Sequence, residues 1–174
     1  INFVPEDRHY HGLFKIRSIS SNTTSALLGS REMGKVNMNR RHQREISQQY
    51  ADKFRTKIVS LDDLIGSLSG GNQQKVVISR ALSTRPKVVI LDEPTRGIDA
   101  AARSDVYGII RQLKEEGVAV LMVSSDIEEV VELADRAITI FQGRINGEFS
   151  HDEISQDALT SASFGIGHER VVAK

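Results

Sequence analysis

Residues 68–75, which read LSGGNQQK, constrain the fold of this chain more than any other segment. Ser69 is a residue type that favours the position just before a helix, and Gly70 and Gly71 leave the following backbone N–H groups unobstructed. The start of such a helix presents free N–H donors and the positive end of its dipole, which suits an anionic phosphate oxygen. The next turns are apolar, so we predict a helix with one broad buried side, formed by Val76, Val77, Ile78, Ala81 and Leu82.

A buried strand is predicted a short distance downstream. Residues 88–91 are four consecutive apolar residues, typical of a parallel strand that is covered on both faces. Asp92 follows at the carboxyl end, where open α/β sheets place their ligands, and it can hold Mg²⁺ through water molecules. Pro94 is expected to keep Glu93 extended, which leaves its carboxylate beside the metal as a general base for an attacking water.

These segments carry a family resemblance. Residues 68–75 resemble the signature loop of ABC ATPases, and residues 88–95 (VVILDEPT) resemble their Walker B strand with its catalytic glutamate. Residues 96–99 (RGID) resemble the D-loop, and Asn72 is similar to the residue that the carbohydrate-import branch carries in its signature loop. ATPases of that branch hold two nucleotide-binding halves in one polypeptide. Residues 124–129 (SSDIEE) look most like the second half of importers of the autoinducer-2 and ribose type.

The resemblance implies an α/β fold of the ABC-type P-loop NTPase class, with a mostly parallel sheet flanked by helices and a helical subdomain. Such domains work as head-to-tail pairs that bind ATP and Mg²⁺. Asp92 would then be the metal-binding residue and Glu93 the catalytic residue. The signature loop would contact ATP held by a second nucleotide-binding half, through Ser69, Gly70, Gly71 and Asn72.

Three further nucleotide-site positions follow from the resemblance. Asp99 lies in the D-loop, and we also expect it to cap the helix that starts at Ala100. Glu6 stands where most members of the family have the Q-loop glutamine, and it adds a negative charge near the triphosphate. Ser125 stands where the switch histidine is expected. Glu6 and Ser125 both count against rapid ATP hydrolysis at this half's own site.

In the family, a Walker A loop precedes the position at which this sequence starts. The resemblance therefore predicts a domain truncated before or at its Walker A, inactive alone as an ATPase. Residues 29–35 (GSREMGK) imitate a Walker A loop up to its last position, where Val36 replaces the required Ser or Thr. No strand is predicted to run into Gly29, so we do not expect this segment to bind phosphate.

Composition restricts the partners. Lys plus Arg and Asp plus Glu are both 23, so no overall field favours nucleic acid. The absence of cysteine fits an intracellular protein, and no apolar run approaches the roughly 20 residues that cross a bilayer. We expect no direct membrane insertion and no direct nucleic-acid binding. The resemblance instead places the chain in the cytoplasm, on the inner face of the plasma membrane, bound to permease subunits through the Q-loop and the helical subdomain.

Four parts are predicted along the chain. Residues 1–16 form the Q-loop strand and loop, and residues 17–84 form a helical subdomain that ends in the signature loop and its helix. In this subdomain Ile46, Tyr50 and Phe54 form an apolar stripe with helical spacing. Residues 85–150 form an α/β core, in which a helix carries Val106, Ile109, Ile110 and Leu113 inward and stops at Gly117. Within this core, residues 137–141 are predicted to form a strand, followed by a turn at 142–143 that leads into residues 144–149. Residues 151–174 form a C-terminal helix, near 155–163, and a tail.

Three functions remain open at this stage. The first is the ATP-hydrolysing half of an importer for a sugar or a sugar-like molecule, autoinducer-2 being one candidate. The second is a non-catalytic pairing module that contributes only its signature loop to a partner's ATP site. The third is an ABC protein that acts on ribosomes or DNA, which the neutral composition disfavours.

Overall fold

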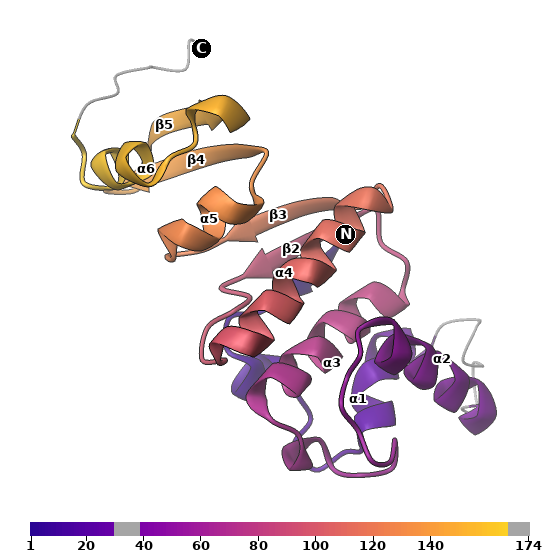
Figure 1. Cartoon of the computed structure of the whole chain (residues 1–174). Coiled ribbons are helices and arrows are strands. Elements are labelled where there is room, and N and C mark those ends of the chain that lie inside the picture. Colours follow the sequence, from indigo (N-terminus) through magenta and orange to yellow (C-terminus); the bar gives the residue numbers. More distant parts are fainter. Residues whose placement is uncertain (30–38, 167–174) are drawn as a thin grey trace. The chain divides into compact units, whose positions relative to one another are not determined.

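The computed structural model describes residues 1–29 and 39–166, which divide into a first unit, Ile1–Val123, and a second unit that begins at Ser124 (Figure 1). Residues 30–36, and with them most of the segment that imitates a Walker A loop, lie outside the described residues. Within the described part, no helix combines the length and the hydrophobicity needed to cross a bilayer.

A three-stranded parallel sheet organises the first unit. Its order is β1 (Asn2–Val4), β2 (Val88–Asp92) and β3 (Ala119–Val123), with β2 in the centre. Val4 pairs with Leu91, and Asp92 pairs with Val123, so the three strands end at one edge. The residues that follow β1 and β2 therefore meet at this edge, which confirms the predicted α/β class.

Two helices, α3 (Gly70–Ser83) and α4 (Ala100–Glu115), cover one face of this sheet (Figure 1). Val89 and Leu91 point into that layer and are fully buried. On the opposite face, Phe3 is 53% exposed and Leu121 is 56% exposed. On that face β2 itself is half-buried at Val88 and Ile90, so full burial on both faces, as predicted, is not observed for the first unit as described.

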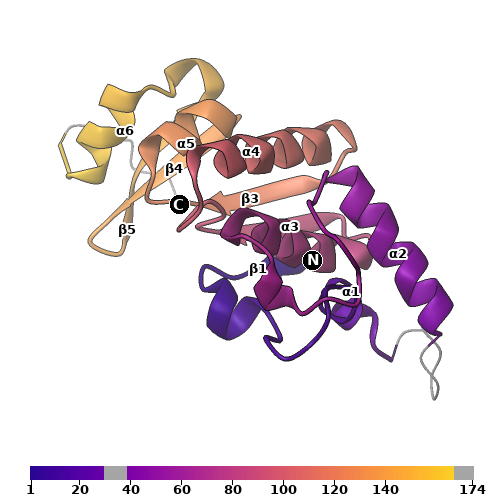
Figure 2. The ribbon, with the colours of Figure 1, turned by 60° about the horizontal axis from the view of Figure 1, so that its bottom comes forward.

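Helix α3 is buried more completely than its sequence suggested. Every residue from Gly71 to Ser83 is buried except Asn72 and Arg80. The sheet, α4 and the helices α1 (Ile19–Thr24) and α2 (Arg40–Lys53) all contact it, so little of its surface reaches solvent (Figure 2).

Helices α1 and α2 meet through polar side chains. The hydroxyls of Ser20 and Ser47 lie 3.1 Å apart, and Gln43 Nε2 donates to Thr24 Oγ1 at 3.0 Å. All four side chains are buried, and each bond satisfies a group that would otherwise be costly to bury. The buried line of α2 consists of Gln43, Ser47 and Ala51.

Helix α4 matches its prediction closely. Asp99 Oδ1 accepts a hydrogen bond from the backbone N–H of Ala102 at 2.9 Å, so Asp99 is the N-cap. The helix ends before Gly117, whose φ of +77° is the left-handed conformation that glycine adopts easily. The four predicted core residues are all buried: Val106, Ile109, Ile110 and Leu113.

The second unit contains α5 (Ile127–Leu133), a hairpin of β4 (Arg136–Phe141) and β5 (Arg144–Ser150), and α6 (Gln156–Ser163). The strands pair antiparallel around a turn at 142–143, as the sequence predicted. Its small core consists of Ala137, Phe149, Leu159 and Ala162. Short helical turns complete the fold of the chain; they span Arg8–Gly12, Ser25–Leu27, Ile65–Ser67 and His151–Glu153.

Candidate nucleotide site

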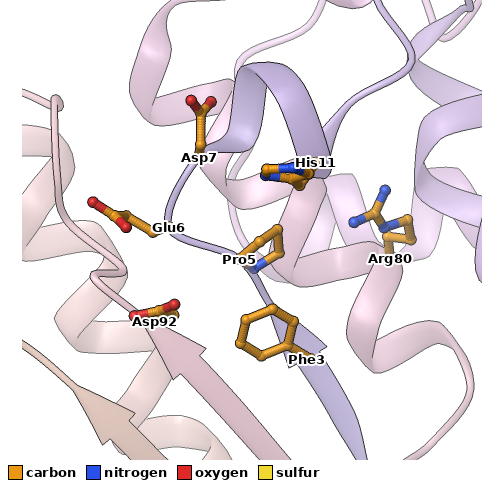
Figure 3. Close-up of a pocket in the computed structure, with 7 residues that line it drawn as sticks. All are labelled: Phe3, Pro5, Glu6, Asp7, His11, Arg80 and Asp92. Atoms are coloured by element: carbon orange, nitrogen blue, oxygen red, sulfur yellow. The ribbon is translucent and has the colours of Figure 1, made fainter.

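Acidic side chains gather at the carboxyl edge of the sheet. Asp92 ends β2, and Glu6 and Asp7 follow β1. All three line a hollow of about 430 Å³, which Figure 3 shows together with its other lining residues, Phe3, Pro5, His11 and Arg80. The volume is within the range of small-molecule pockets, and its position is the one predicted for Asp92.

Arg80 is a pocket residue that the sequence analysis missed. It extends from α3, and in Figure 3 Phe3 and Pro5 lie between its guanidinium and the carboxylates of Glu6 and Asp92. Burial lowers the pKa of Arg80. An arginine starts from so high a value that its charge persists at neutral pH. In the sequence, Arg80 is marked only as a charged residue among the apolar residues of the predicted helix.

Glu93 directly follows Asp92, but its backbone is not extended. Its φ is +46°, a left-handed conformation that costs a residue other than glycine about 1–3 kcal/mol. Two backbone hydrogen bonds hold it there: Glu93 N donates to Val123 O at 2.8 Å, and Arg96 N donates to Glu93 O at 3.1 Å. The predicted extended conformation is wrong, because these tertiary and turn contacts override the preference that Pro94 imposes.

Glu6 is not an isolated charge. Its carboxylate forms an ion pair with Arg96, on the loop between β2 and α4. The repulsion toward a triphosphate that the sequence suggested is therefore reduced by a neighbouring cation. Asp7 has a different role: the backbone N–H of Tyr10, and then that of His9, lower the pKa of Asp7 by binding its side chain.

Helix α3 begins at Gly70, with Ser69 at the N-cap position. The Ser69 hydroxyl caps no backbone N–H, contrary to the prediction. It accepts instead from Asn72 Nδ2 at 2.9 Å, while Asn72 Oδ1 accepts from the backbone of Lys57 at 2.9 Å. Asn72 thus ties Ser69 to the segment before the helix, and Ser69 itself remains exposed.

The two glycines also permit close packing. A Cβ added to Gly71 would lie 2.3 Å from the Cβ of Ala102 on α4. A Cβ added to Gly70 would lie 2.9 Å from Arg8 Nη2. Gly71 therefore requires glycine for this tertiary contact, whereas at Gly70 the neighbouring guanidinium is the end of a flexible side chain that can move aside.

Ser125 belongs to the second unit, near its first residue. The neighbouring Ser124 hydroxyl lies 2.6 Å from a carboxylate oxygen of Glu129, which is fully buried. Asp126 caps α5 by accepting from the backbone of Glu128 at 3.1 Å. Ser125 is thus the exposed residue of a well-ordered turn.

The residues suit magnesium only in its water-mediated form. In the part of the chain that the structure describes, no cluster of three or more His, Asp or Glu side chains could enclose a metal. Mg²⁺ keeps several waters and needs only one or two carboxylates besides a nucleotide's phosphates, so Asp92 fits that requirement.

A protein-family model described as ABC transporter matches residues 1–96. The xylose import ATP-binding protein XylG of Moorella thermoacetica is 41% identical over 165 residues, which are 95% of this chain and 32% of that protein. The chain therefore belongs to the ABC transporter family, and it spans about a third of the length of this curated relative.

Solved structures support the fold. A dimeric ATP-binding cassette in a post-hydrolysis state, bound to ADP and Pi, matches with a TM-score of 0.71 at 21% identity, over 86% of this chain and 63% of that one. An ATP-binding cassette of an ABC transporter matches with a TM-score of 0.74 at 22% identity, over 92% of this chain and 68% of that one. Identities this low establish a shared fold and no more.

Proposed function

We propose that this chain is the larger part of one nucleotide-binding half of an ABC importer, which hydrolyses ATP to drive uptake of a sugar or sugar-like molecule. Family membership and the 41% identity to a xylose import protein support this assignment. The structural observation that carries it is the Asp92–Glu93 pair at the carboxyl edge of the sheet, with Glu93 held in a left-handed backbone conformation. Strain of this kind concentrates at functional sites.

In this proposal the two acids have separate roles. Asp92 would bind Mg²⁺ through water, and the ion would neutralise charge on the phosphates of ATP. Glu93 would accept a proton from the attacking water, a contribution of about 10²–10⁴-fold in rate. Its two backbone hydrogen bonds hold the backbone that carries this side chain in place.

The start of α3 would serve a second site. Ser69 is exposed and free of a capping bond to the helix backbone, so its hydroxyl and the N–H groups behind it can face a phosphate. We propose that Ser69, Gly70, Gly71 and Asn72 contact ATP held by a second nucleotide-binding half, with Asp99 nearby on the same surface of the pair.

A permease would bind the loop that follows β1. Tyr10 is 82% exposed, and Phe14 and Ile16 are also exposed, so this loop presents three large, largely apolar side chains to a partner. Binding there would place the protein on the cytoplasmic face of the plasma membrane. We further propose that residues 17–84 form the helical subdomain beside this surface.

The alternative, a non-catalytic pairing module, rests on Glu6 and Ser125 at positions where the resemblance leads us to expect glutamine and histidine. Glu93→Gln in the full-length parent protein separates the two. Loss of transport-coupled ATP hydrolysis by about 10²-fold or more, with ATP binding retained, is expected for the catalytic half. Glu115→Gln, an exposed glutamate on α4, is the matched control. Unchanged hydrolysis in Glu93→Gln identifies the pairing module instead.

A further inference from the structure

Arg8 lies at a junction that the proposed chemistry does not use. It is the first residue of the turn Arg8–Gly12, directly after β1 and its loop. Asp7 caps this turn by accepting from the backbone N–H groups of His9 at 2.8 Å and Tyr10 at 3.1 Å. The backbone that carries Arg8 is therefore fixed on the side facing the loop between β2 and α4.

The guanidinium of Arg8 binds two consecutive carbonyls of that loop. Nη1 donates to Arg96 O at 3.0 Å, and Nη2 donates to Gly97 O at 3.1 Å. Gly97 has a φ of +69°, and this turn directs the two neighbouring carbonyls to the same side chain. Arginine suits this arrangement because its planar fork offers two separated donors, whereas a lysine offers one point charge.

The same guanidinium also contacts the start of α3. A Cβ at Gly70 would meet Arg8 Nη2 at 2.9 Å and Gly97 O at 3.4 Å, so all three groups converge on one point. Partial burial lowers the pKa of Arg8, as expected for a cation enclosed by backbone. Three segments that are far apart in the sequence thus meet at one side chain.

A second interaction joins the loop after β1 to residue 96. The carboxylate of Glu6 forms an ion pair with the side chain of Arg96, while Arg8 binds the backbone of Arg96. Residues 6 and 8 therefore hold residue 96 by its side chain and its carbonyl respectively. The ion pair is half exposed and adds little by itself, so the two hydrogen bonds that Arg8 donates are the main connection.

We propose that Arg8 is a positioning residue that fixes the spacing between the start of α3 and the loop that leads to Asp99. Its consequence for catalysis depends on the proposed function, because these two segments are the ones assigned to the second nucleotide-binding half. Its effect on the position of the loop does not depend on the proposed function. Since Arg8 is carried by the loop assigned to the permease, any displacement of that loop moves the carbonyls of residues 96 and 97 directly.

The first test is hydrogen exchange in the full-length parent protein, with Arg8→Lys and Arg8→Ala. Four reporter amides have hydrogen bonds in or beside the loop: those of Arg96, Ile98, Ala102 and Arg103. We expect them to exchange about tenfold faster in both variants, because two charge-assisted bonds are weakened or lost. Amides of β2 report global opening and are expected to keep their rates.

Arg41→Lys is the matched control, since Arg41 is highly exposed on α2 and its ion pair with Glu45 lies on the surface. If the reporter amides of Arg8→Lys exchange at the wild-type rate, the two-pronged guanidinium of Arg8 is not required and the proposal is overturned. Equal acceleration in β2 would show general destabilisation and would overturn the positioning role.

The second test is steady-state ATP hydrolysis by the same variants. Arg8 donates its hydrogen bonds to Arg96 O and Gly97 O, and neither carbonyl is a group proposed to bind ATP. We therefore expect kcat to fall about tenfold while the KM for ATP changes less than about twofold. A rise in KM with unchanged kcat contradicts the proposal. If Glu93→Gln leaves hydrolysis intact while Arg8→Lys still loosens the loop, the proposed function fails and the positioning role stands.

Discussion

Gly71→Ala tests the packing of α3 on α4 with a substitution of one methyl group. The new Cβ would lie 2.3 Å from the Cβ of Ala102, whereas ordinary contacts begin near 3.4 Å. The obstacle is a Cβ fixed to a helix backbone, so no rotamer change can move it away. The two helices must separate by about 1 Å at their closest approach, in a core packed as densely as an organic crystal.

The magnitude follows from two opposing effects. Overpacking a rigid contact costs about 1–3 kcal/mol, and the upper end applies when neither partner can rotate away. Alanine in place of helical glycine returns about 1 kcal/mol through helix propensity. We therefore expect Gly71→Ala to lower the free energy of unfolding by about 2 kcal/mol.

The partner substitution gives the control. Ala102→Gly alone should cost about 1 kcal/mol in helix propensity. The double variant removes the clash and exchanges one glycine for another, so its stability should return to the wild-type value. Urea unfolding of the four proteins would then give a coupling free energy of about 3 kcal/mol. This account of the contact would be refuted if Gly71→Ala unfolded with the wild-type free energy. It would also be refuted if the losses of unfolding free energy in the two single variants were additive in the double variant.

Two further predictions concern charges. Lys75 is 4% exposed and its ammonium lies 2.7 Å from Asp105 Oδ2, while Asp105 is 59% exposed. Asp105→Asn removes the negative charge that compensates this buried cation, which keeps only neutral acceptors such as Arg55 O, and should cost about 3 kcal/mol. Lys75→Met leaves a carboxylate that water can reach and should cost below about 1 kcal/mol. Urea unfolding that gives the reverse order contradicts this. The pKa of Asp7 lies below its ordinary value of 3.8, chiefly because the Tyr10 N–H binds it, so its stabilising effect is complete above that value and is lost as the pH falls through the lower folded pKa. NMR titration of the carboxyl checks the direction, and a midpoint above 3.8 would contradict it.

Features that depend on local periodicity could be predicted from the sequence. The core residues of α4, its Asp99 cap and the hairpin of the second unit all agree with the structure. The same holds for Asp92, because a strand end is marked by the apolar run before it. Apolar periodicity was only partly informative on α2. Of the predicted stripe, Phe54 is buried at the end of the helix while Ile46 and Tyr50 are half-buried, and the fully buried line of the helix also contains Gln43 and Ser47. Polar side chains that satisfy one another across a helix pair leave no hydrophobic signal.

Features that depend on partners far along the chain could not be predicted. The backbone of Glu93 is set by the carbonyl of Val123 on the next strand, against the preference of the adjacent proline. Arg8 and Gly97 are separated by 89 positions, and nothing local marks Arg8 as more than a solvated cation. The hydroxyl of Ser69 was expected to cap α3, but a side chain one turn later occupies it.

The backbone of Glu93 and the contacts of Arg8 are connected by one residue, Arg96. Arg96 donates its backbone N–H to Glu93 O, offers its carbonyl to Arg8 and pairs its side chain with Glu6. The strained backbone of Glu93 is held between this turn and Val123 O, so its geometry depends on where Arg96 sits. A shift of the loop after β1 would act on the carbonyl of Arg96 and, through the same peptide segment, on the carbonyl of Glu93. The carboxylate proposed as the general base is thus two hydrogen bonds away from the loop proposed to bind the permease.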